Sequence, residues 1–205
     1  MKISALLSLV PMVAAIGTRQ PKSSEDPFRV VSARSGSPIH FLTLTASGSN
    51  FWLGGKSETY CPSSAGSYCA SQTNDTIVFG GNNLDVVVPG GQSIYVAHSG
   101  ALSFTTPHSS YVPAGSYQGS FSYTPGSSFG KWTFAGEGAS GFMACPVSNS
   151  TLTSTRRRSS TPRWQVYVAL QNATVPTKNV NDCLGFDALA VPINSSSTHA
   201  AWEYI

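Results

Sequence analysis

Charged side chains are scarce in this chain of 205 residues, in which Lys and Arg together number 12 and Asp and Glu number 9. The formal net charge is only +3, and one of these charges belongs to Lys2 in an apolar leader. The sequence contains no basic stripe interleaved with aromatic residues. Because nucleic-acid binding relies on concentrated Lys and Arg, the charge pattern argues against a nucleic-acid partner.

The sequence also lacks a hydrophobic run long enough for a membrane helix. Its longest apolar stretch, residues 3–16, is shorter than the roughly 20 residues that such a helix needs. This stretch follows Lys2 and ends in Ala15-Ile16-Gly17, which supplies small residues at the −3 and −1 positions of a cleavage site. We therefore predict a secretory signal peptide at residues 1–17. The final residues form no hydrophobic tail, so we expect no membrane anchor.

Helical periodicity and repeats of fixed length are missing as well, whereas turn-forming residues are abundant, with 19 Gly and 13 Pro. Many short alternating runs between turns are typical of an all-β fold. We predict a single-domain β-sandwich over residues 28–205, with a closed β-barrel as the alternative. A polar segment with two prolines, residues 18–27, is predicted to be a flexible tail.

The clearest strand signal is a meander at residues 84–104. It reads as three strands, joined by a type II turn at Pro89-Gly90-Gly91 and a three-residue turn at His98-Ser99-Gly100. Residues 183–189 read as a short helical or irregular segment, and Trp202 and Tyr204 alternate in a last strand. Outside the meander, the predicted strands are 28–33, 38–45, 50–53, 116–123, 131–134 and 164–170, while residues 77–79 form a short apolar run and residues 142–145 lead into a long polar loop.

Four cysteines occur, and a secreted chain favours their pairing as disulfides. Three connectivities are open; we favour Cys61–Cys69, which closes a short loop, together with Cys145–Cys183. A metal site would need another pattern, but no Cys-x-x-Cys and no histidine at ligand spacing is present. We therefore expect neither a metal nor another cofactor.

Two kinds of modification are predicted from local motifs. Arg156-Arg157-Arg158 lies in a polar loop, where it is either a solvated stretch or a site for a protease that cleaves at basic residues; the Cys145–Cys183 bridge would span it. Asn-x-Ser/Thr sequons predict glycosylation in a secreted protein. They occur at Asn74, Asn149, Asn172 and Asn194.

Catalytic motifs are weak. Gly126-Ser127-Ser128-Phe129-Gly130 matches Gly-x-Ser-x-Gly, and Asp182 or Asp187 and then His199 follow in the order of a hydrolase triad. The motif needs a strand before the serine and a helix after it, but an alternating strand follows here. No motif joins the remaining acids and histidines, so we predict no catalytic residues and no enzyme. These residues are Asp85, Glu137, Glu203, His40, His98 and His108.

The four tryptophans, Trp52, Trp132, Trp164 and Trp202, allow two interpretations. An exposed indole provides a platform on which a sugar ring stacks. Core packing is the commoner role, and we favour it for each of the four. Trp52 lies next to Gly54-Gly55 and is the best candidate for a glycan contact.

Several short blocks, in order along residues 28–204, carry a family resemblance. They are Arg34-Ser35-Gly36-Ser37-Pro38-Ile39-His40, Phe51-Trp52-Leu53-Gly54-Gly55, Tyr60-Cys61-Pro62, Val88-Pro89-Gly90-Gly91-Gln92, Gly100-Ala101-Leu102-Ser103-Phe104, Gly141-Phe142-Met143-Ala144-Cys145-Pro146, Cys183-Leu184-Gly185-Phe186 and Ala201-Trp202-Glu203-Tyr204. Together they resemble the PhiA family of fungal cell-wall proteins, the phialide-associated proteins of filamentous ascomycetes, whose relatives are also described as IgE-binding proteins.

This resemblance implies a secreted structural protein of the fungal cell wall, involved in the development of phialides and conidia and without known catalytic residues. Its expected partners are wall polysaccharides or other wall proteins. The alternative is a secreted carbohydrate-binding module or effector-like protein.

Overall fold

A computed structural model describes residues 24–70, 73, 75–136, 138–147, 163–193 and 200–205. The predicted signal peptide and most of the predicted tail lie outside these residues. No helix in the described part is long and apolar enough to cross a membrane.

Short strands are the main regular structure of the described chain, as the turn-rich sequence predicts. Its helical elements are the 3-10 helices η1 (Ser63–Ala65) and η2 (Val180–Asp182) and the single-turn helix α1 (Ser67–Ala70). The strands are β1 (Phe28–Ala33), β2 (Leu44–Ser47), β3 (Asn50–Leu53), β4 (Thr59–Tyr60), β5 (Ile77–Phe79), β6 (Asn83–Leu84), β7 (Ile94–Val96), β8 (Leu102–Phe104), β9 (Tyr117–Gln118), β10 (Phe121–Thr124), β11 (Gly130–Phe134), β12 (Ala139–Pro146), β13 (Trp164–Leu170), β14 (Leu184–Pro192) and β15 (Glu203–Tyr204).

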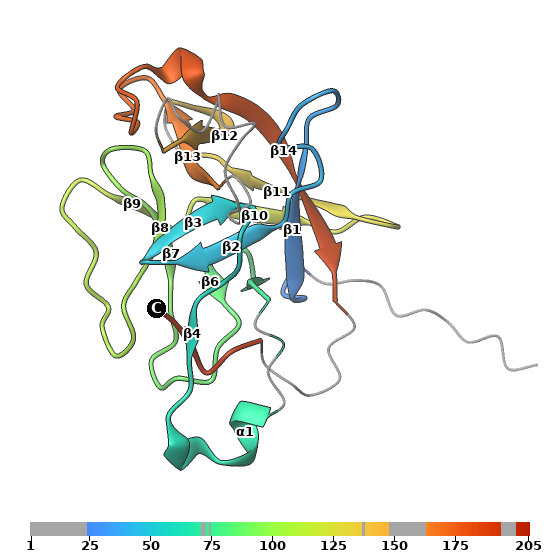
Figure 1. Cartoon of the computed structure of the whole chain (residues 1–205), viewed down its shortest axis with the longest axis vertical. Helices are drawn as coiled ribbons and strands as arrows, with labels where there is room; N and C mark the ends of the chain where they lie inside the picture. Colours follow the sequence, from blue (N-terminus) through green and yellow to red (C-terminus); the bar gives the residue numbers. More distant parts are fainter. Residues whose placement is uncertain (1–23, 71–72, 74, 137, 148–162, 194–199) are drawn as a thin grey trace, which may run out of the picture.

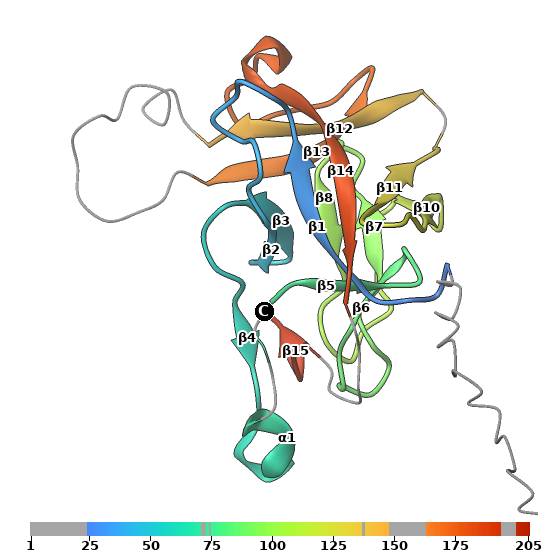
Figure 2. The same cartoon turned by 90° about the vertical axis from the view of Figure 1, so that its right-hand side faces the viewer.

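Strand β14 joins the two halves of the molecule. Its first residues pair with β12, and its later residues pair with β1 on one side and β11 on the other. Figures 1 and 2 show this long strand running from the β12–β13 hairpin along β1. Strand switching of this kind forms a corner between two packed sheets. The large antiparallel sheet does not close into a barrel, so the predicted all-β sandwich is confirmed in preference to the barrel.

The core lies between the two halves and follows strand alternation. On β13, Trp164, Val166 and Val168 face this core, as predicted. Tyr167 points to the opposite face, where it joins a smaller apolar cluster with Met143 of β12. Both faces of the β12–β13 hairpin are therefore buried, which explains why its strands are apolar almost throughout.

The segment 200–205 inserts into the fold like an additional strand. Strand β15 pairs with β4, and Tyr204 is fully buried. The equally buried Gln92 clamps this residue: its side-chain amide donates to the Tyr204 carbonyl at 3.0 Å, and its side-chain oxygen accepts from the Tyr204 N–H at 2.8 Å. The Tyr204 hydroxyl donates to the carbonyl of Asp75 and accepts from the N–H of Ile77. Burial raises the pKa of this hydroxyl well above its usual range.

Several predicted elements are confirmed. Strands at residues 28–33, 50–53 and 164–170 have the predicted bounds. The turn at Pro89-Gly90-Gly91 also forms, with the Gly91 N–H donating to the Val88 carbonyl at 2.9 Å and Gly90 at φ +89°. This is the positive φ that a type II turn requires at its third position.

The predicted strand at residues 38–45 is wrong. The chain instead turns after β1, and β2 begins only at Leu44. Ile39 is buried and Phe41 is exposed at φ +60°, so these two residues do not share a strand face. The alternation of apolar residues in this region belongs to a loop that buries the side chain of Ile39, and not to a pleated strand.

Three further predictions need correction. Residues 183–189, expected to be helical or irregular, form most of β14, because β1, β11 and β12 all pair with that strand. The strand expected at 84–88 ends at Leu84, since the backbone beyond it bonds instead to Ala201 and Trp202. The strand expected at 116–123 is divided into β9 and β10.

Both disulfides have the pairing that the sequence favours. Cys61 and Cys69 close the lobe that carries η1 and α1, at the end of the molecule away from the β12–β13 hairpin (Figures 1 and 2). Cys145 on β12 is joined to Cys183, which follows η2, within the smaller apolar cluster. The second bridge fastens the segment that contains η2 to strand β12.

Candidate functional site

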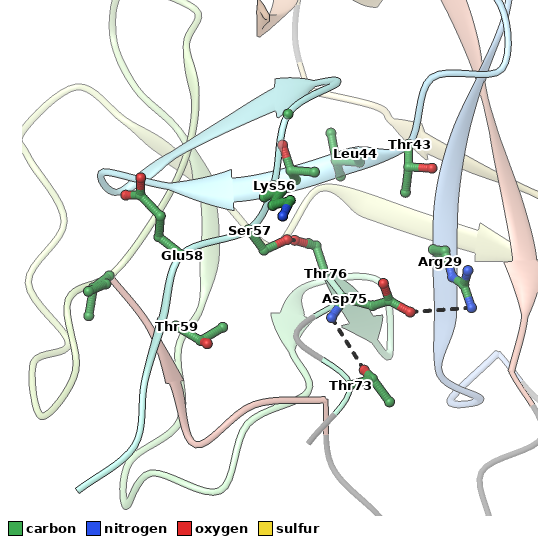
Figure 3. Close-up of a pocket in the computed structure, with 13 residues that line it drawn as sticks. Arg29, Thr43, Leu44, Lys56, Ser57, Glu58, Thr59, Thr73, Asp75 and Thr76 are labelled. Atoms are coloured by element: carbon green, nitrogen blue, oxygen red, sulfur yellow. Dashed lines mark hydrogen bonds and ion pairs between the residues drawn. The ribbon is translucent and has the colours of Figure 1, made fainter. Parts of the chain in front are cut away.

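An open pocket of about 690 Å³ lies beside β1, β2 and β4. Figure 3 shows its residues, which come from distant parts of the sequence. Apart from Gly55, Leu44 and Ile205, every side chain in the lining is polar or charged: Arg29, Thr43, Thr45, Lys56, Ser57, Glu58, Thr59, Thr73, Asp75 and Thr76.

Arg29 and Asp75 form an ion pair at one side of this pocket. The guanidinium Nη2 lies 3.5 Å from the Asp75 carboxylate, and both side chains are about two-fifths exposed. A pair this exposed contributes no more than about 1 kcal/mol to stability. Its charged groups therefore remain open to a polar ligand.

Hydroxyl groups line the floor of the pocket. The Thr76 side chain is buried; its Oγ1 accepts from the Ala46 N–H at 2.8 Å and lies 2.7 Å from Ser57 Oγ. Thr45 Oγ1 donates to the Gly54 carbonyl at 2.9 Å. These bonds fix the hydroxyls in position. A polar wall that is already ordered suits a ligand rich in hydroxyl groups, because little side-chain freedom is lost on binding.

Trp52, the predicted glycan contact, lies on β3 with its ring against Arg163. The guanidinium carbon lies 4.6 Å from the ring centroid, and the indole N–H donates to the Ser47 carbonyl at 3.0 Å. The half-buried indole is therefore packed on one face and hydrogen-bonded at its edge. Trp132 and Trp164 are core side chains, and Trp202 is half-buried.

The Gly-x-Ser-x-Gly stretch does not form a nucleophile elbow. It connects β10 to β11 in an antiparallel hairpin, so a strand follows Ser128 where the motif needs a helix. Asp187 lies on β14, and Asp182 accepts a hydrogen bond from the side chain of Asn179 in the η2 turn. His199 lies outside the described residues.

The other candidate acids and histidines do not converge. Glu203 is buried on β15, and His108 is exposed at φ +59°. His98 lies in the β7–β8 turn, and His40 stacks on Phe41. Within the described chain no group of three or more His, Cys, Asp or Glu could hold a metal ion. Glu137 falls outside the described residues.

One of the four sequons can be placed. Asn172 lies exposed in the turn after β13, where a glycan would extend into solvent. The others, Asn74, Asn149 and Asn194, lie outside the described residues, as does Arg156-Arg157-Arg158.

Sequence reasoning missed the pocket. Of its charged residues only Asp75 lies in a motif, as the variable position of the Asn74 sequon, and its lining combines residues of β1, the chain from Thr43 to β4, the approach to β5 and Ile205. The only available signal was the abundance of Ser and Thr between residues 43 and 76, which also fits ordinary turns. The pairing of β4 with β15 brings these segments together.

Comparison with known proteins identifies the family. The family model described as PhiA-like secreted protein matches residues 28–205. The chain belongs to this family. A relative from Arthroderma benhamiae (strain ATCC MYA-4681 / CBS 112371), described as an uncharacterized secreted protein, is 37% identical over 207 residues and covers 100% of both chains. No solved structure matches the chain.

The PhiA-like match covers the whole described sandwich from Phe28 onward. Two of the blocks on which the sequence resemblance rests also meet in space, because Gln92 ends one block and Tyr204 ends another. The family match and the relative show that the protein is secreted. Its family is described as one of secreted proteins and not as a family of enzymes.

Proposed function

We propose that this PhiA-like protein is a non-catalytic structural and surface protein of the fungal cell wall, where it acts in the development of phialides and conidia. Membership of the PhiA-like secreted family supports this proposal. The signal peptide predicted at residues 1–17 supplies the route out of the cell. Two disulfides suit an oxidising extracellular setting.

Wall polysaccharide is the proposed partner, and the pocket in Figure 3 is the observation that carries this part. Each sugar hydroxyl both donates and accepts hydrogen bonds. The pocket offers groups for both: ordered Ser and Thr hydroxyls, the Asp75 carboxylate as acceptor, and the Arg29 and Lys56 cations as donors. Bonds to charged groups are the stronger ones, so Asp75 is expected to hold the ligand most firmly.

The Asp75→Ala variant is expected to bind insoluble β-1,3-glucan or chitin at least about 10-fold more weakly. The reason is that loss of one hydrogen bond to a charged group costs about 1.5–3 kcal/mol. Co-sedimentation with each purified polymer measures this change. The substitution leaves the Asn74 sequon intact, because Asp75 occupies its variable position.

Asp187→Ala is the matched control, since Asp187 is an exposed aspartate on β14 and does not line the pocket. It should bind like the unaltered protein. Equal binding by the Asp75 and Asp187 variants would remove the pocket from the proposal. Polysaccharide binding by a protein found only in the medium would instead support the alternative of a secreted carbohydrate-binding module or effector.

A further inference from the structure

The loop between β1 and β2 presents an aromatic ring to solvent from a strained backbone position. Phe41 has φ +60° and its side chain is 65% exposed. A bulky residue in the left-handed region is an outlier, because its Cβ crowds the backbone there. Glycine would fit the same position without strain. Backbone strain of this kind concentrates at functional positions.

The surrounding structure holds this conformation firmly. The Ser32 backbone in β1 donates to the Leu42 carbonyl at 3.0 Å and accepts from the Phe41 N–H at 2.9 Å. The Ser32 hydroxyl lies buried and donates to the Ile39 carbonyl, and its oxygen is 3.1 Å from the Leu42 carbonyl oxygen. The Ile39 side chain is completely buried and anchors the loop. The ring of Phe41 is thus mounted on a rigid base, although it faces solvent.

A polar edge accompanies the ring. The imidazole of His40 stacks on Phe41 with 3.9 Å between ring centroids, and its Nδ1 accepts from the Arg34 N–H at 3.1 Å. Neutral His40 therefore carries its proton on Nε2 and can donate it to a ligand. The Arg34 guanidinium is itself positioned by a 2.7 Å bond from Nη1 to the Gly185 carbonyl.

We propose that Phe41 is a stacking platform for a hexose ring of a wall polysaccharide, with His40 donating a hydrogen bond at its edge. The apolar C–H face of the sugar would cover the ring face that His40 leaves open. This inference rests on the proposed function, since it assigns a contact for the same polysaccharide.

Two other partners fit less well. A protein partner needs about 800 Å² of contact on each side, far more than one ring provides. A cationic ligand such as an ammonium group carries donors only, and it would meet the His40 N–H donor at the edge of the ring. A neutral ligand with one apolar face and hydroxyls around its edge matches both parts of the site.

The Phe41→Gly variant separates binding from stability. It removes the ring and relieves the strained φ, so its melting temperature should equal or exceed that of the unaltered protein. Its affinity for insoluble β-1,3-glucan or chitin should nevertheless fall by about 10-fold, because the ring face on which the sugar stacks is lost. Phe41→Trp should retain binding. Phe41→Asn also removes the ring, and asparagine tolerates the left-handed region, so this variant should bind as weakly as Phe41→Gly.

Phe129→Ser is the matched control, because Phe129 is 55% exposed in the β10–β11 hairpin and has no such stacked partner. Normal binding by this variant, together with weak binding by Phe41→Gly and Phe41→Asn, supports the platform. Normal binding by both Phe41 variants overturns it and leaves the proposed function standing. Failure of the unaltered protein to bind either polymer overturns both.

Discussion

The Tyr204→Ala variant is expected to lose about 4 kcal/mol of its free energy of unfolding. Truncation of a fully buried aromatic leaves a cavity and removes apolar contacts, which together cost about 3–5 kcal/mol. The ring of Tyr204 packs edge-on against Phe104 at 6.3 Å in the core. Since domains are stable by only about 5–15 kcal/mol, this single change is expected to bring the protein close to unfolding.

Urea denaturation followed by circular dichroism measures this loss. Tyr204→Phe keeps the ring but leaves the Ile77 N–H and the Asp75 carbonyl without the hydroxyl, so a smaller loss of about 1–3 kcal/mol is expected. Tyr60→Ala is the control from the paired strand β4. Tyr60 is 52% exposed, and its loss should change stability by no more than about 0.5 kcal/mol. Equal effects of Tyr204→Ala and Tyr60→Ala would show that the segment 200–205 is not part of the folding core.

Trp132→Ala is also expected to lower the free energy of unfolding by about 3–5 kcal/mol. Trp132 is the centre of an aromatic cluster that joins the two halves of the sandwich. Its ring stacks with Phe121 of β10 at 5.2 Å and with Phe142 of β12 at 5.0 Å. Its indole N–H also donates to the Gly81 carbonyl at 2.9 Å. Truncation therefore creates a cavity and leaves a buried carbonyl without its donor.

The near-ultraviolet circular dichroism of Trp132→Ala should weaken, and its urea midpoint should fall. Phe129→Ala, in the same hairpin, is the control and should leave both unchanged, because Phe129 is mostly exposed. A loss below about 1.5 kcal/mol for Trp132→Ala would contradict the central place of the indole in the core.

Sequence patterns predicted the fold class and several strands because local alternation decided them. On β13 the residues that alternate in the sequence are those that face the core. The apolar residues at 184–190 alternate too, but Leu and Ala favour helices, and this preference obscured the strand pattern. Pairing with three neighbouring strands decides the conformation there, and small Ala188 fits opposite Trp132. Tertiary context of this kind is not visible in a local window.

The candidate sites were harder to predict, since each depends on distant contacts. Trp52 was selected because it lies beside two glycines, yet Arg163 packs on its ring. Phe41 gave no signal, because its apolar neighbours suggested a strand and its positive φ follows from bonds to Ser32. Gln92 belongs to a recognised block, but its pairing with Tyr204 spans 112 positions of sequence.

The pocket and the Phe41 ring provide complementary chemistry for one kind of ligand. The pocket supplies fixed hydroxyls and charged groups for the hydroxyls of a sugar. Phe41 supplies an apolar face with a donor at its edge. When two weak contacts engage one polymer chain at once, the overall affinity exceeds that of either contact alone. A wall polymer would therefore be retained more firmly than a single sugar.

Fractionation of the producing fungus tests the central claim most directly. Hyphae and conidia are separated into culture medium, soluble extract and purified wall, and the protein is quantified in each by an antibody. The proposed function predicts that the protein is enriched in the wall fraction and is released by glucanase or chitinase digestion. A protein found wholly in the medium and never in the wall would contradict it.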